Sequence, residues 1–286
     1  MTATLIDGTA VAGRIRAGLR NEVGELGEIG LATVLVGEDP PSQIYIRLKH
    51  QAAEEVGIRA VDRRLPEETS EGELLELVAE LNDDDSIDGI LVQTPLPGQL
   101  DEAHVMRAID PMKDVDGLHP FNAGQLFFGH PTLVPATPLG IMRLLEEYEV
   151  KVAGARAVVV GRSLIVGRPM AMLLLHENAT VTICHSRTDD LARQTLDADI
   201  LVVAVGLAGV VTADMVKPGS AVVDVGMNRT EAGLVGDVDP GAAERAALMT
   251  PVPGGVGPMT IAMLLSNTVR AARYRRGHLA FPRLRR

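Results

Sequence analysis

Short aliphatic runs alternate with amphipathic helical patterns along this chain, and this alternation limits its fold more than any other feature. In the first half, three runs rich in Val, Leu and Ile are separated by two helical patterns. This β-α-β-α-β order is typical of a mostly parallel sheet with helices on both faces. A second series of the same kind follows the polar, turn-rich segment 111–117, which we interpret as a domain boundary.

The patterns predict the following elements. Strands are expected at 31–36, 59–65, 89–93, 157–160, 180–185, 200–205 and 221–225, and a hairpin at 228–236. Helices are expected at 42–56, 71–81, 101–109, 138–148, 168–177, 189–196 and about 258–275, with Ser42 as the N-cap of the first. The last helix is expected to pack back on the first domain.

We therefore predict an α/β protein of two three-layer domains separated by an interdomain cleft. The N-terminal catalytic domain would comprise residues 1–118, joined by the C-terminal helix 262–286. Residues 119–261 would form a Rossmann-type dinucleotide-binding domain. A chain of 286 residues is long for one domain and natural for two of this kind.

The composition agrees with this fold and excludes several classes of protein. Aromatic residues make up 2% of the chain against 46% for all hydrophobic residues, so the core must be aliphatic. A net charge of −11 disfavours a nucleic-acid partner, because phosphates require neutralising cations. No segment is apolar for long enough to span a bilayer, so no membrane association is expected. The single cysteine, Cys184, is expected to be a buried, inert thiol in a reducing compartment, and a cytoplasmic location is predicted by elimination.

The C-terminal segment from Arg270 to Arg286 is rich in arginine, against the acidic balance of the whole chain. We interpret it as a solvated and partly frayed terminus. The alternative interpretation is a contact with a polyanion or with another subunit.

A glycine-rich turn at 161–169 follows a predicted strand and opens a predicted helix, where a Rossmann fold binds a dinucleotide pyrophosphate. Gly161, Arg162 and Ser163 begin this turn. Its spacing differs from G-x-G-x-x-G, so a simple tight turn is the alternative. The next strand ends in the basic, hydroxyl-bearing segment 185–188, where NAD enzymes commonly carry an acid. Arginine and serine suit a 2′-phosphate, which favours NADP over NAD. The alternative is a set of surface residues that cap helices.

Tyr45 and Lys49 lie four residues apart on the first predicted helix and share one face. Most such pairs are solvated surface. However, Lys49 is one of only four lysines, with Lys113, Lys151 and Lys217, whereas arginine supplies nearly all the other positive charge. Arginine cannot lose its proton at neutral pH, so a retained lysine indicates an amine that must do so.

Three further segments are placed to meet a ligand. Gln93 ends a predicted buried strand, and ligands of open α/β sheets bind beyond such strand ends, although its amide could serve only the nearby loop backbone. Asp114 and Asp116 flank Val115 and could be Asx-turn residues, or one could bind a ring with N–H donors. The segment 251–258 is rich in Gly and Pro and forms a shaped loop that is expected to line the cleft.

These pieces occur together, in the same order, in the bifunctional methylenetetrahydrofolate dehydrogenase/methenyltetrahydrofolate cyclohydrolase family, which this chain resembles over nearly its whole length to about Arg270. The segments that carry the resemblance are 42–49 (SQIYIRLK), 89–97 (GILVQTPLP), 113–117 (KDVDG), 135–140 (PATPLG), 161–163 (GRS) and 253–258 (PGGVGP). The combination is highly specific, although no single segment is.

The resemblance implies a function: oxidation of 5,10-methylenetetrahydrofolate with NADP⁺, followed by hydrolysis of the 5,10-methenyl product to 10-formyltetrahydrofolate. It also implies roles for individual residues. Tyr45 would stack on the p-aminobenzoyl ring, Lys49 would be the catalytic amine, Gln93 would assist it, and Asp116 would hold the pterin. The NADP site would include Gly161, Arg162, Ser163, Ser186 and Met227, and the substrate site would extend to Pro253, Gly254 and Gly255. No metal is implied, and the usual assembly is a homodimer.

Four positions depart from the family pattern. Cysteine is expected where Ala136 stands, leucine at Thr94, a polar residue at Leu164 and often lysine at Arg168. Ala136 cannot act as a nucleophile. Leu164 and Arg168 concern the affinity for the cofactor more than its identity.

Three other functions would also fit such a chain. One is a monofunctional, NAD-dependent methylenetetrahydrofolate dehydrogenase. Another is a non-catalytic nucleotide sensor, which would have no evident need for the amine of Lys49. The third is an amino-acid or shikimate-type dehydrogenase with a similar two-domain plan.

Overall fold

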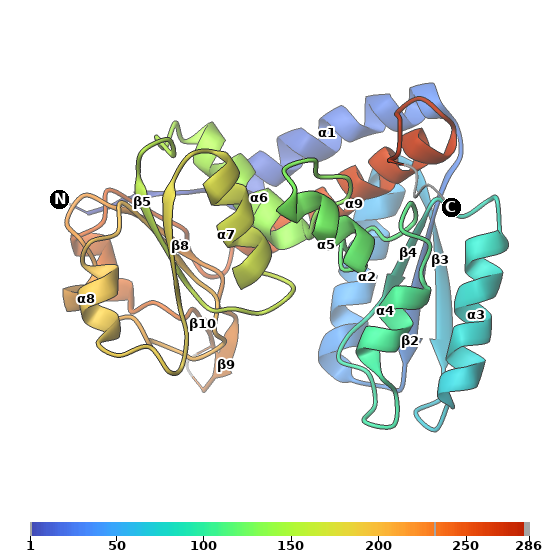
Figure 1. Cartoon of the computed structure of the whole chain (residues 1–286), viewed down its shortest axis with the longest axis horizontal. Helices are drawn as coiled ribbons and strands as arrows, with labels where there is room; N and C mark the ends of the chain where they lie inside the picture. Colours follow the sequence, from blue (N-terminus) through green and yellow to red (C-terminus); the bar gives the residue numbers. More distant parts are fainter. Residues whose placement is uncertain (1, 232, 283–286) are drawn as a thin grey trace. The chain divides into compact units, whose positions relative to one another are not determined.

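The computed structural model describes residues 2–231 and 233–282 and divides into two compact units (Figure 1). Within these residues, one unit contains a three-stranded sheet and comprises Arg14–Ala136 and Ile261–Arg286. The other contains a six-stranded sheet and comprises Met1–Gly13 and Thr137–Thr260. We call them the three-stranded and the six-stranded unit. The contacts thus group residues 1–13 with the six-stranded unit and residues 119–136 with the three-stranded unit. The predicted domain limits at 118 and 261 remain a prediction.

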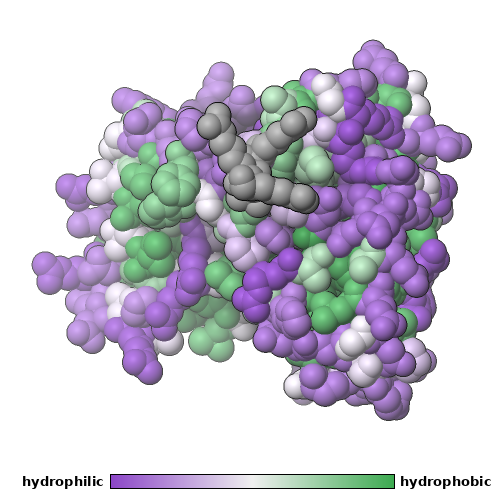
Figure 2. Space-filling model, turned by 45° about the vertical axis from the view of Figure 1, so that its right-hand side comes forward, coloured by the Kyte–Doolittle hydropathy of each residue, from purple (hydrophilic) through white to green (hydrophobic). Residues whose placement is uncertain are grey.

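Both units have the aliphatic interior that the composition predicts, with buried Ala, Val, Leu and Ile making up most of the core. Polar side chains cover most of the face drawn in Figure 2, and apolar groups reach the surface in patches between them. Among the described residues, no helix is long and apolar enough to cross a membrane.

The three-stranded unit has a central strand that is covered on both faces. Its strands are β2 (Ile29–Val36), β3 (Ile58–Leu65) and β4 (Gly89–Val92), in the order β3-β2-β4 with parallel pairing. All eight residues of β2 are buried, because helices pack on both sides of it. Its helices are α2 (Pro40–Val56), α3 (Glu71–Asp83), α4 (Glu102–Ala108) and α5 (Pro120–Phe127), with residues 14–26 of α1 (Gly8–Leu26) and most of α9 (Val256–Arg275).

The two faces of this sheet pack on different helices. Val34 and Ile90 point to one face, where they join the core formed with α3 and α4. On the opposite face, the side chain of Thr33 hydrogen-bonds to His50 of α2 at 2.7 Å. There, a Cβ on Gly89 would lie 3.3 Å from Thr268 of α9. This confirms the expectation that the last helix packs with the first part of the chain.

The expected N-cap of the first predicted helix was wrong by three residues. Helix α2 begins at Pro40, and Asp39 is its N-cap, with a side chain that accepts a 2.9 Å hydrogen bond from the backbone N–H of Ser42. Two prolines occupy the first turn, where they have no N–H to satisfy and where their fixed φ suits a helix. Ser42 therefore supplies the first N–H that needs an acceptor, and Asp39 provides it.

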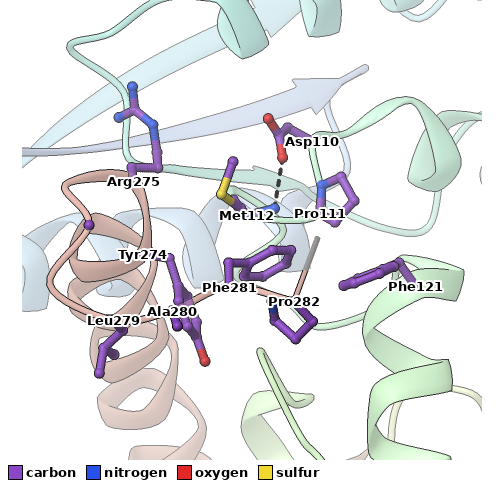
Figure 3. A pocket seen from close by; sticks show the side chains of 11 residues that line it. Asp110, Pro111, Met112, Phe121, Tyr274, Arg275, Leu279, Ala280, Phe281 and Pro282 are labelled. Atoms are coloured by element: carbon purple, nitrogen blue, oxygen red, sulfur yellow. Dashed lines mark hydrogen bonds between the residues drawn. The ribbon is translucent and has the colours of Figure 1, made fainter. Parts of the chain in front are cut away.

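The C-terminal segment is folded as far as it is described, which contradicts the expectation of a frayed terminus. Arg275 donates to Asp88 at 2.8 Å, and Arg276 donates to the other oxygen of Asp88 at 3.2 Å. The Asp88 side chain is only 3% exposed. Beyond the helix, Phe281 lies against the rings of Tyr274 and Phe121 and lines a cavity of about 670 Å³ (Figure 3). The remaining tail positions, 283–286, lie outside the described residues.

The six-stranded unit is a parallel sheet with the order β1-β11-β8-β7-β5-β6. Its strands are β1 (Thr4–Leu5), β5 (Arg156–Val160), β6 (Thr180–Cys184), β7 (Ile200–Val203), β8 (Ala221–Asp224) and β11 (Leu248–Met249). Its other elements are the start of α1 (Gly8–Leu26), α6 (Ala136–Glu147), α7 (Gly167–His176), α8 (Leu191–Thr195), the 3₁₀ turns η1 (Ala213–Met215) and η2 (Pro240–Glu244), and the hairpin β9 (Asn228–Thr230) and β10 (Gly233–Val235).

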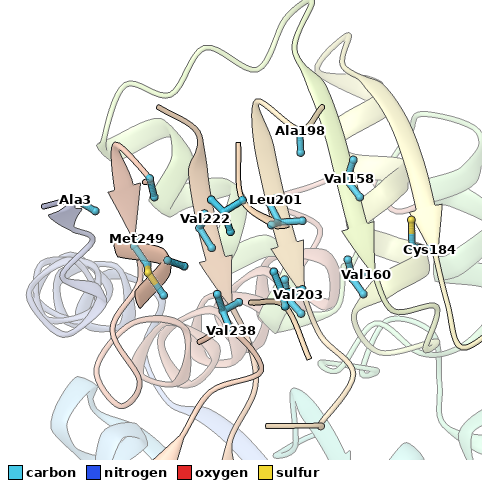
Figure 4. Close-up of a cluster of buried hydrophobic side chains, with 14 residues drawn as sticks. Ala3, Val158, Val160, Cys184, Ala198, Leu201, Val203, Val222, Val238 and Met249 are labelled. Carbon is cyan, nitrogen blue, oxygen red and sulfur yellow. The ribbon is translucent and has the colours of Figure 1, made fainter. Parts of the chain in front are cut away.

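Alternate residues of these strands form two separate cores. Val158 and Leu201 belong to the core on one face, shown in Figure 4, which includes the buried, free thiol of Cys184. Val159 and Val202 point the other way and pack on α6 and α7. The chain passes from β5 to β6 on one side and then returns past β5 to β7. This reversal is the topological switch point at which doubly wound sheets bind ligands.

In the part of the chain that the structure describes, six elements were absent from the sequence prediction: α1, α5, β1, β11 and the two 3₁₀ turns η1 and η2. Helix α1 begins Gly-Thr-Ala-Val-Ala-Gly and continues with further glycines, which weakens its helical signal. Strands β1 and β11 are two residues long and form through pairing with strands distant in the sequence, β1 with β11 and β11 also with β8. Apart from these, the two-domain α/β fold and the hairpin are confirmed.

Candidate functional site

The amine of Lys49 and the amide of Gln93 meet in the three-stranded unit. Helix α2 carries Lys49 on its last turns, and Gln93 directly follows β4. The Nζ of Lys49 donates to Oε1 of Gln93 at 3.0 Å, and Nε2 of Gln93 donates to the carbonyl of Thr94 at 2.7 Å. Because its NH₂ group is committed to that carbonyl, the amide presents its oxygen to the amine. The amide of Gln93 thus serves the nearby loop backbone, which was one of its two alternatives, and its contact with a ligand stays a prediction.

Burial weakens the basicity of Lys49. Desolvation lowers the pKa of its amine, and the carboxylate of Asp116 opposes that shift in part. Conversely, burial raises the pKa of Asp116 to about 6, although the Lys49 charge acts in the opposite direction. The amine and the carboxylate are thus electrostatically coupled in one partly buried place, as two members of a reaction centre would be.

The two acidic residues of the loop 113–117 have different surroundings. Asp114 is buried, and its side chain accepts from the backbone N–H of His119 at 2.7 Å and from Nδ2 of Asn122 at 2.8 Å. It is the loop-forming residue of the pair. Between them, the carbonyl of Val115 accepts a 2.8 Å hydrogen bond from Asn267 of α9. These anchors fix the backbone on both sides of Asp116 and leave its side chain beside Lys49.

Tyr45 lies one turn before Lys49 on α2, as the spacing predicts. Its ring is partly buried, and this burial raises the pKa of the phenol, so the hydroxyl stays protonated at neutral pH. His50 follows Lys49 and was not singled out from the sequence. Its contact with the buried Thr33 attaches the end of α2 to β2, and burial lowers its pKa, which favours the neutral ring.

At position 113, lysine is required for a reason other than the loss of a proton. Its Nζ donates to the carbonyls of Leu81, Asn82 and Asp84 at 2.9, 2.7 and 2.8 Å. These carbonyls end α3, so the amine caps that helix. A compact ammonium with three donors satisfies three converging carbonyls, which a planar guanidinium cannot do in the same space. A rare lysine in this chain is therefore not by itself a sign of catalysis.

The turn after β5 in the six-stranded unit packs its backbone so closely that it requires glycine at two positions. Gly161 has φ +128°, and a Cβ there would lie 2.3 Å from the carbonyl oxygen of Ala204. A Cβ on Gly167 would lie 2.2 Å from the oxygen of Gly161. The hydroxyl of Ser163 accepts from the N–H groups of Val166 and Gly167 at 3.2 and 3.3 Å and so caps the start of α7.

Polar and basic groups stand next to this turn. Arg162 is exposed, and its carbonyl accepts from Nε of Arg168 at 3.1 Å. Ser186 is exposed in the turn after β6, which is closed by a 2.8 Å hydrogen bond from the N–H of His185 to the hydroxyl of Thr188. Strands β5 and β6 are parallel neighbours, so their carboxyl ends place these side chains at one edge of the sheet.

Exposed apolar side chains gather on the loops at the same edge. They follow β5, β7 and β8 and comprise Leu164, Ile165, Val205, Leu207 and Met227. The exposed Arg162, the hydroxyls of Ser163 and Ser186 and this apolar surface together fit a dinucleotide, whose phosphates need cationic or hydroxyl partners and whose rings need apolar contact.

The Pro-Gly loop is built on the N-terminus of the chain. The N–H of Thr9 donates to the carbonyl of Gly254 at 3.0 Å, and a Cβ on Gly8 would lie 1.8 Å from the oxygen of Gly255. Gly254 itself has φ +106°, and the bond before Pro253 is cis. The loop leads into α9, where a Cβ on Gly257 would lie 3.8 Å from the sulfur of Met227.

The departures from the family pattern lie in different surroundings. Ala136 is buried at the first position of α6. Leu164 is 68% exposed, so an apolar side chain projects from the turn after β5 where a polar one was expected. Thr94 contributes the carbonyl that orients Gln93, and a main-chain group serves that purpose whichever side chain is present.

Two family models cover most of the chain. Residues 6–116 match the catalytic domain of tetrahydrofolate dehydrogenase/cyclohydrolase, and residues 135–276 match its NAD(P)-binding domain. Among relatives, the bifunctional protein FolD of Exiguobacterium sibiricum is 54% identical over 276 residues, which cover 95% of this chain and 100% of that protein.

Solved structures show the same similarity. The bifunctional methylenetetrahydrofolate dehydrogenase/cyclohydrolase of Campylobacter jejuni is 48% identical, with a TM-score of 0.94 over 96% of this chain and 99% of that one. The Trypanosoma brucei N5,N10-methylenetetrahydrofolate dehydrogenase-cyclohydrolase, complexed with NADP cofactor and an inhibitor, is 41% identical. Its TM-score is 0.92 over 98% of this chain and 100% of that one.

Proposed function

Because this chain belongs to the tetrahydrofolate dehydrogenase/cyclohydrolase family, we propose that Lys49, Gln93 and Asp116 form its reaction centre and that the Gly161 turn holds its cofactor. The protein is a bifunctional enzyme. It oxidises 5,10-methylenetetrahydrofolate to 5,10-methenyltetrahydrofolate with NADP⁺, and it hydrolyses that product to 10-formyltetrahydrofolate.

For the oxidation, the cofactor supplies the acceptor for the hydride that leaves the methylene carbon. This chemistry needs no protein nucleophile, in keeping with Ala136 where a cysteine was expected. The residues of the chain bind and orient. Arg162, with the hydroxyls of Ser163 and Ser186, would hold the phosphates of NADP, and Met227 would contact a ring. Pro253, Gly254 and Gly255 would shape the space for the folate.

For the hydrolysis, a water oxygen adds to the methenyl carbon of the cationic substrate. Neutral Lys49 takes a proton from that water while the new C–O bond forms, and Gln93 holds the amine in place. The bond from the same carbon to N5 then breaks as the added oxygen loses its remaining proton to solvent and becomes the formyl oxygen, and the protonated amine returns its proton to N5. The lowered pKa of Lys49 supports this role, because a base must be unprotonated to act.

The folate itself would be held by Asp116 and Tyr45. A carboxylate can accept hydrogen bonds from the N–H donors of the pterin, and the partly buried ring of Tyr45 can stack on the p-aminobenzoyl group. The single observation that carries the assignment is the 3.0 Å hydrogen bond from Lys49 to Gln93.

The test is a spectrophotometric assay with methylenetetrahydrofolate and each nicotinamide cofactor. We expect turnover with NADP⁺, much less with NAD⁺, and decay of the methenyl intermediate catalysed by the enzyme. Turnover with NAD⁺ together with accumulation of the methenyl compound would indicate the monofunctional alternative. Binding of NADP⁺ without any turnover would indicate a sensor.

We further propose that the enzyme is a cytoplasmic homodimer. The proposal is supported by the family's usual assembly and by the one cysteine, which is free and buried, as a reducing compartment allows. Sedimentation equilibrium of the purified chain tests the assembly, and a mass of one chain at micromolar concentration would contradict it.

A further inference from the structure

Two buried carboxylates lie at the carboxyl edge of the six-stranded sheet and have no part in the mechanism above. Asp224 ends β8 and is 2% exposed, whereas Asp237 follows β10 and is fully buried. Among the described residues, neither carboxylate forms an ion pair with a lysine, arginine or histidine. Both carboxylates instead accept hydrogen bonds from N–H donors. The segments that carry these donors therefore indicate which parts of the chain each carboxylate holds in place.

The side chain of Asp237 connects two loops. Its Oδ2 accepts from the backbone N–H groups of Val205 and Gly206 at 2.7 and 2.9 Å. Its Oδ1 accepts from Nδ2 of Asn228 at 2.9 Å. Val205 and Gly206 belong to the loop after β7, and Asn228 directly follows Met227 in the segment after β8. One carboxylate therefore fixes the separation of these two loops.

Asp224 in turn fixes the position of Asp237. Its Oδ1 accepts from the N–H groups of Asp237 and Gly226, both at 2.9 Å, and its Oδ2 accepts from Val238 at 2.9 Å. The packing is tight enough to require glycine. A Cβ on Gly236 would lie 1.8 Å from Oδ2 of Asp224, and one on Gly226 would lie 2.2 Å from Oδ1 of Asp237.

The loop after β7 borders the Gly161 turn. The carbonyl of Ala204, one residue before Val205, lies against Gly161, as its 2.3 Å distance to a Cβ built there shows. The loops also carry two of the exposed apolar side chains at this edge, Val205 at 41% and Met227 at 43% exposure. Strands β7 and β8 are parallel neighbours, so the two side chains extend from adjacent strand ends.

We propose that Asp237 is a positioning residue for the dinucleotide site, which holds the loops carrying Val205 and Met227 at the spacing that the cofactor requires. This inference rests on the proposed cofactor site at Gly161. A carboxylate suits the role because it accepts three hydrogen bonds from three donors. The amide of asparagine offers one oxygen and would turn its NH₂ group toward donors of the same kind.

The two activities of the enzyme provide the test, because hydrolysis of methenyltetrahydrofolate requires no NADP⁺. In Asp237→Ala, the dissociation constant for NADP⁺ and its KM in the dehydrogenase assay should rise on the order of tenfold. The cyclohydrolase kcat/KM, measured without cofactor, should stay within about twofold of the wild-type value, because hydrolysis does not use the NADP⁺ site. On a scale where 1.36 kcal/mol changes a rate tenfold, this is a small effect. Asp237→Asn should give an intermediate affinity. The matched control is Asp239→Asn, whose exposed side chain accepts only from Gly241 at the start of η2.

A second variant keeps the test decisive if Asp237→Ala does not fold. Asn228→Ala leaves the carboxylate its two backbone donors and removes the attachment on the Met227 side, together with a long 3.5 Å contact from the same amide to the carbonyl of Val235. We expect it to weaken NADP⁺ binding several-fold in the same direction. Unchanged NADP⁺ affinity in either variant, or equal losses of both activities in Asp237→Ala with no effect of Asn228→Ala, would overturn the proposal. A wild-type enzyme that binds no NADP⁺ would instead refute the proposed cofactor site itself.

Discussion

The amide oxygen of Gln93 lies 3.0 Å from the amine nitrogen of Lys49, although 44 residues separate them along the chain. The parallel pairing of β2 with β4 and the packing of α2 on the same sheet bring them together. The contact places a polar acceptor beside an amine whose pKa is lowered by burial. From this arrangement and its neighbours, five changes have predictable outcomes.

Replacing the amine should separate the two activities. Lys49→Gln should lower cyclohydrolase turnover by about 10²–10⁴-fold, the usual contribution of a general base, and reduce dehydrogenase turnover less. Lys49→Arg should fail equally, because a guanidinium keeps its proton. The measurement is the decay of the methenyl chromophore. Lys217→Gln serves as the control, since Lys217 pairs with Asp199 in the other unit. Normal hydrolysis by Lys49→Gln would refute the assignment.

Changing Gln93 should move the pH dependence of hydrolysis. The wild-type rate should rise with pH as Lys49 loses its proton and level off above its lowered pKa. A carboxylate in Gln93→Glu would favour the charged amine and raise its pKa, which shifts the profile to higher pH by about one unit or more. Gln93→Leu is the comparison, because it lowers the rate without adding charge. An unshifted profile in Gln93→Glu would exclude direct contact between the two groups during catalysis.

Folate binding should depend on the ionised form of Asp116. The pKa of this carboxyl is raised to about 6, so the anion predominates above that pH and is lost as the pH falls through it. We expect the KM for methylenetetrahydrofolate to increase below about pH 6 for the wild type. Asp116→Ala should raise this KM sharply at every pH and remove the inflection, with the KM for NADP⁺ little changed. An unaltered folate KM would remove Asp116 from the pterin site.

A methyl group at the cofactor turn should block the dinucleotide. In Gly161→Ala, the added Cβ would need to displace the carbonyl of Ala204, 2.3 Å away, at a φ of +128° that alanine rarely adopts. NADP⁺ affinity should fall on the order of tenfold or more, as measured by titration. Gly13→Ala is the control, because its Cβ would meet no atom within 4 Å in the interior of α1. Wild-type affinity in Gly161→Ala would argue against a pyrophosphate at this turn.

The arginines at the end of α9 should contribute to stability and not to catalysis. Arg275→Ala removes hydrogen bonds to Asp88 and to the carbonyl of Ile87. It should lower the free energy of unfolding by about 1–3 kcal/mol, since these bonds involve charged and mostly buried groups. Arg143→Ala breaks an exposed pair with Glu146 and should cost less than about 1 kcal/mol. Chemical denaturation measures both. Equal losses of unfolding free energy in the two variants would mean that the burial of Asp88 does not strengthen its pairing with Arg275.

The order of the strands and helices could be predicted because it depends on patterns a few residues long. The buried run of β2 and the helical spacing of Tyr45 and Lys49 are local properties, and they determine the fold class and one face of the candidate site. The glycine-rich turn at 161–169 was found from such a local pattern too, and the resemblance added individual roles for residues such as Ser186 and Met227. Helix α1 and the two-residue strands β1 and β11 were missed because a prediction from local patterns needs a strong local signal. Their signals are weak, and their partners are distant in the sequence.

What each charged side chain does was decided only by the tertiary structure. Lys49 and Lys113 are the same residue type, yet one meets an amide and a carboxylate whereas the other caps three carbonyls of α3. Arg275, expected to be solvated, is paired with the buried Asp88. The pKa of a side chain and its hydrogen-bond partners depend on desolvation and on groups brought close by folding. Neither quantity is encoded in the residues adjacent to it along the chain.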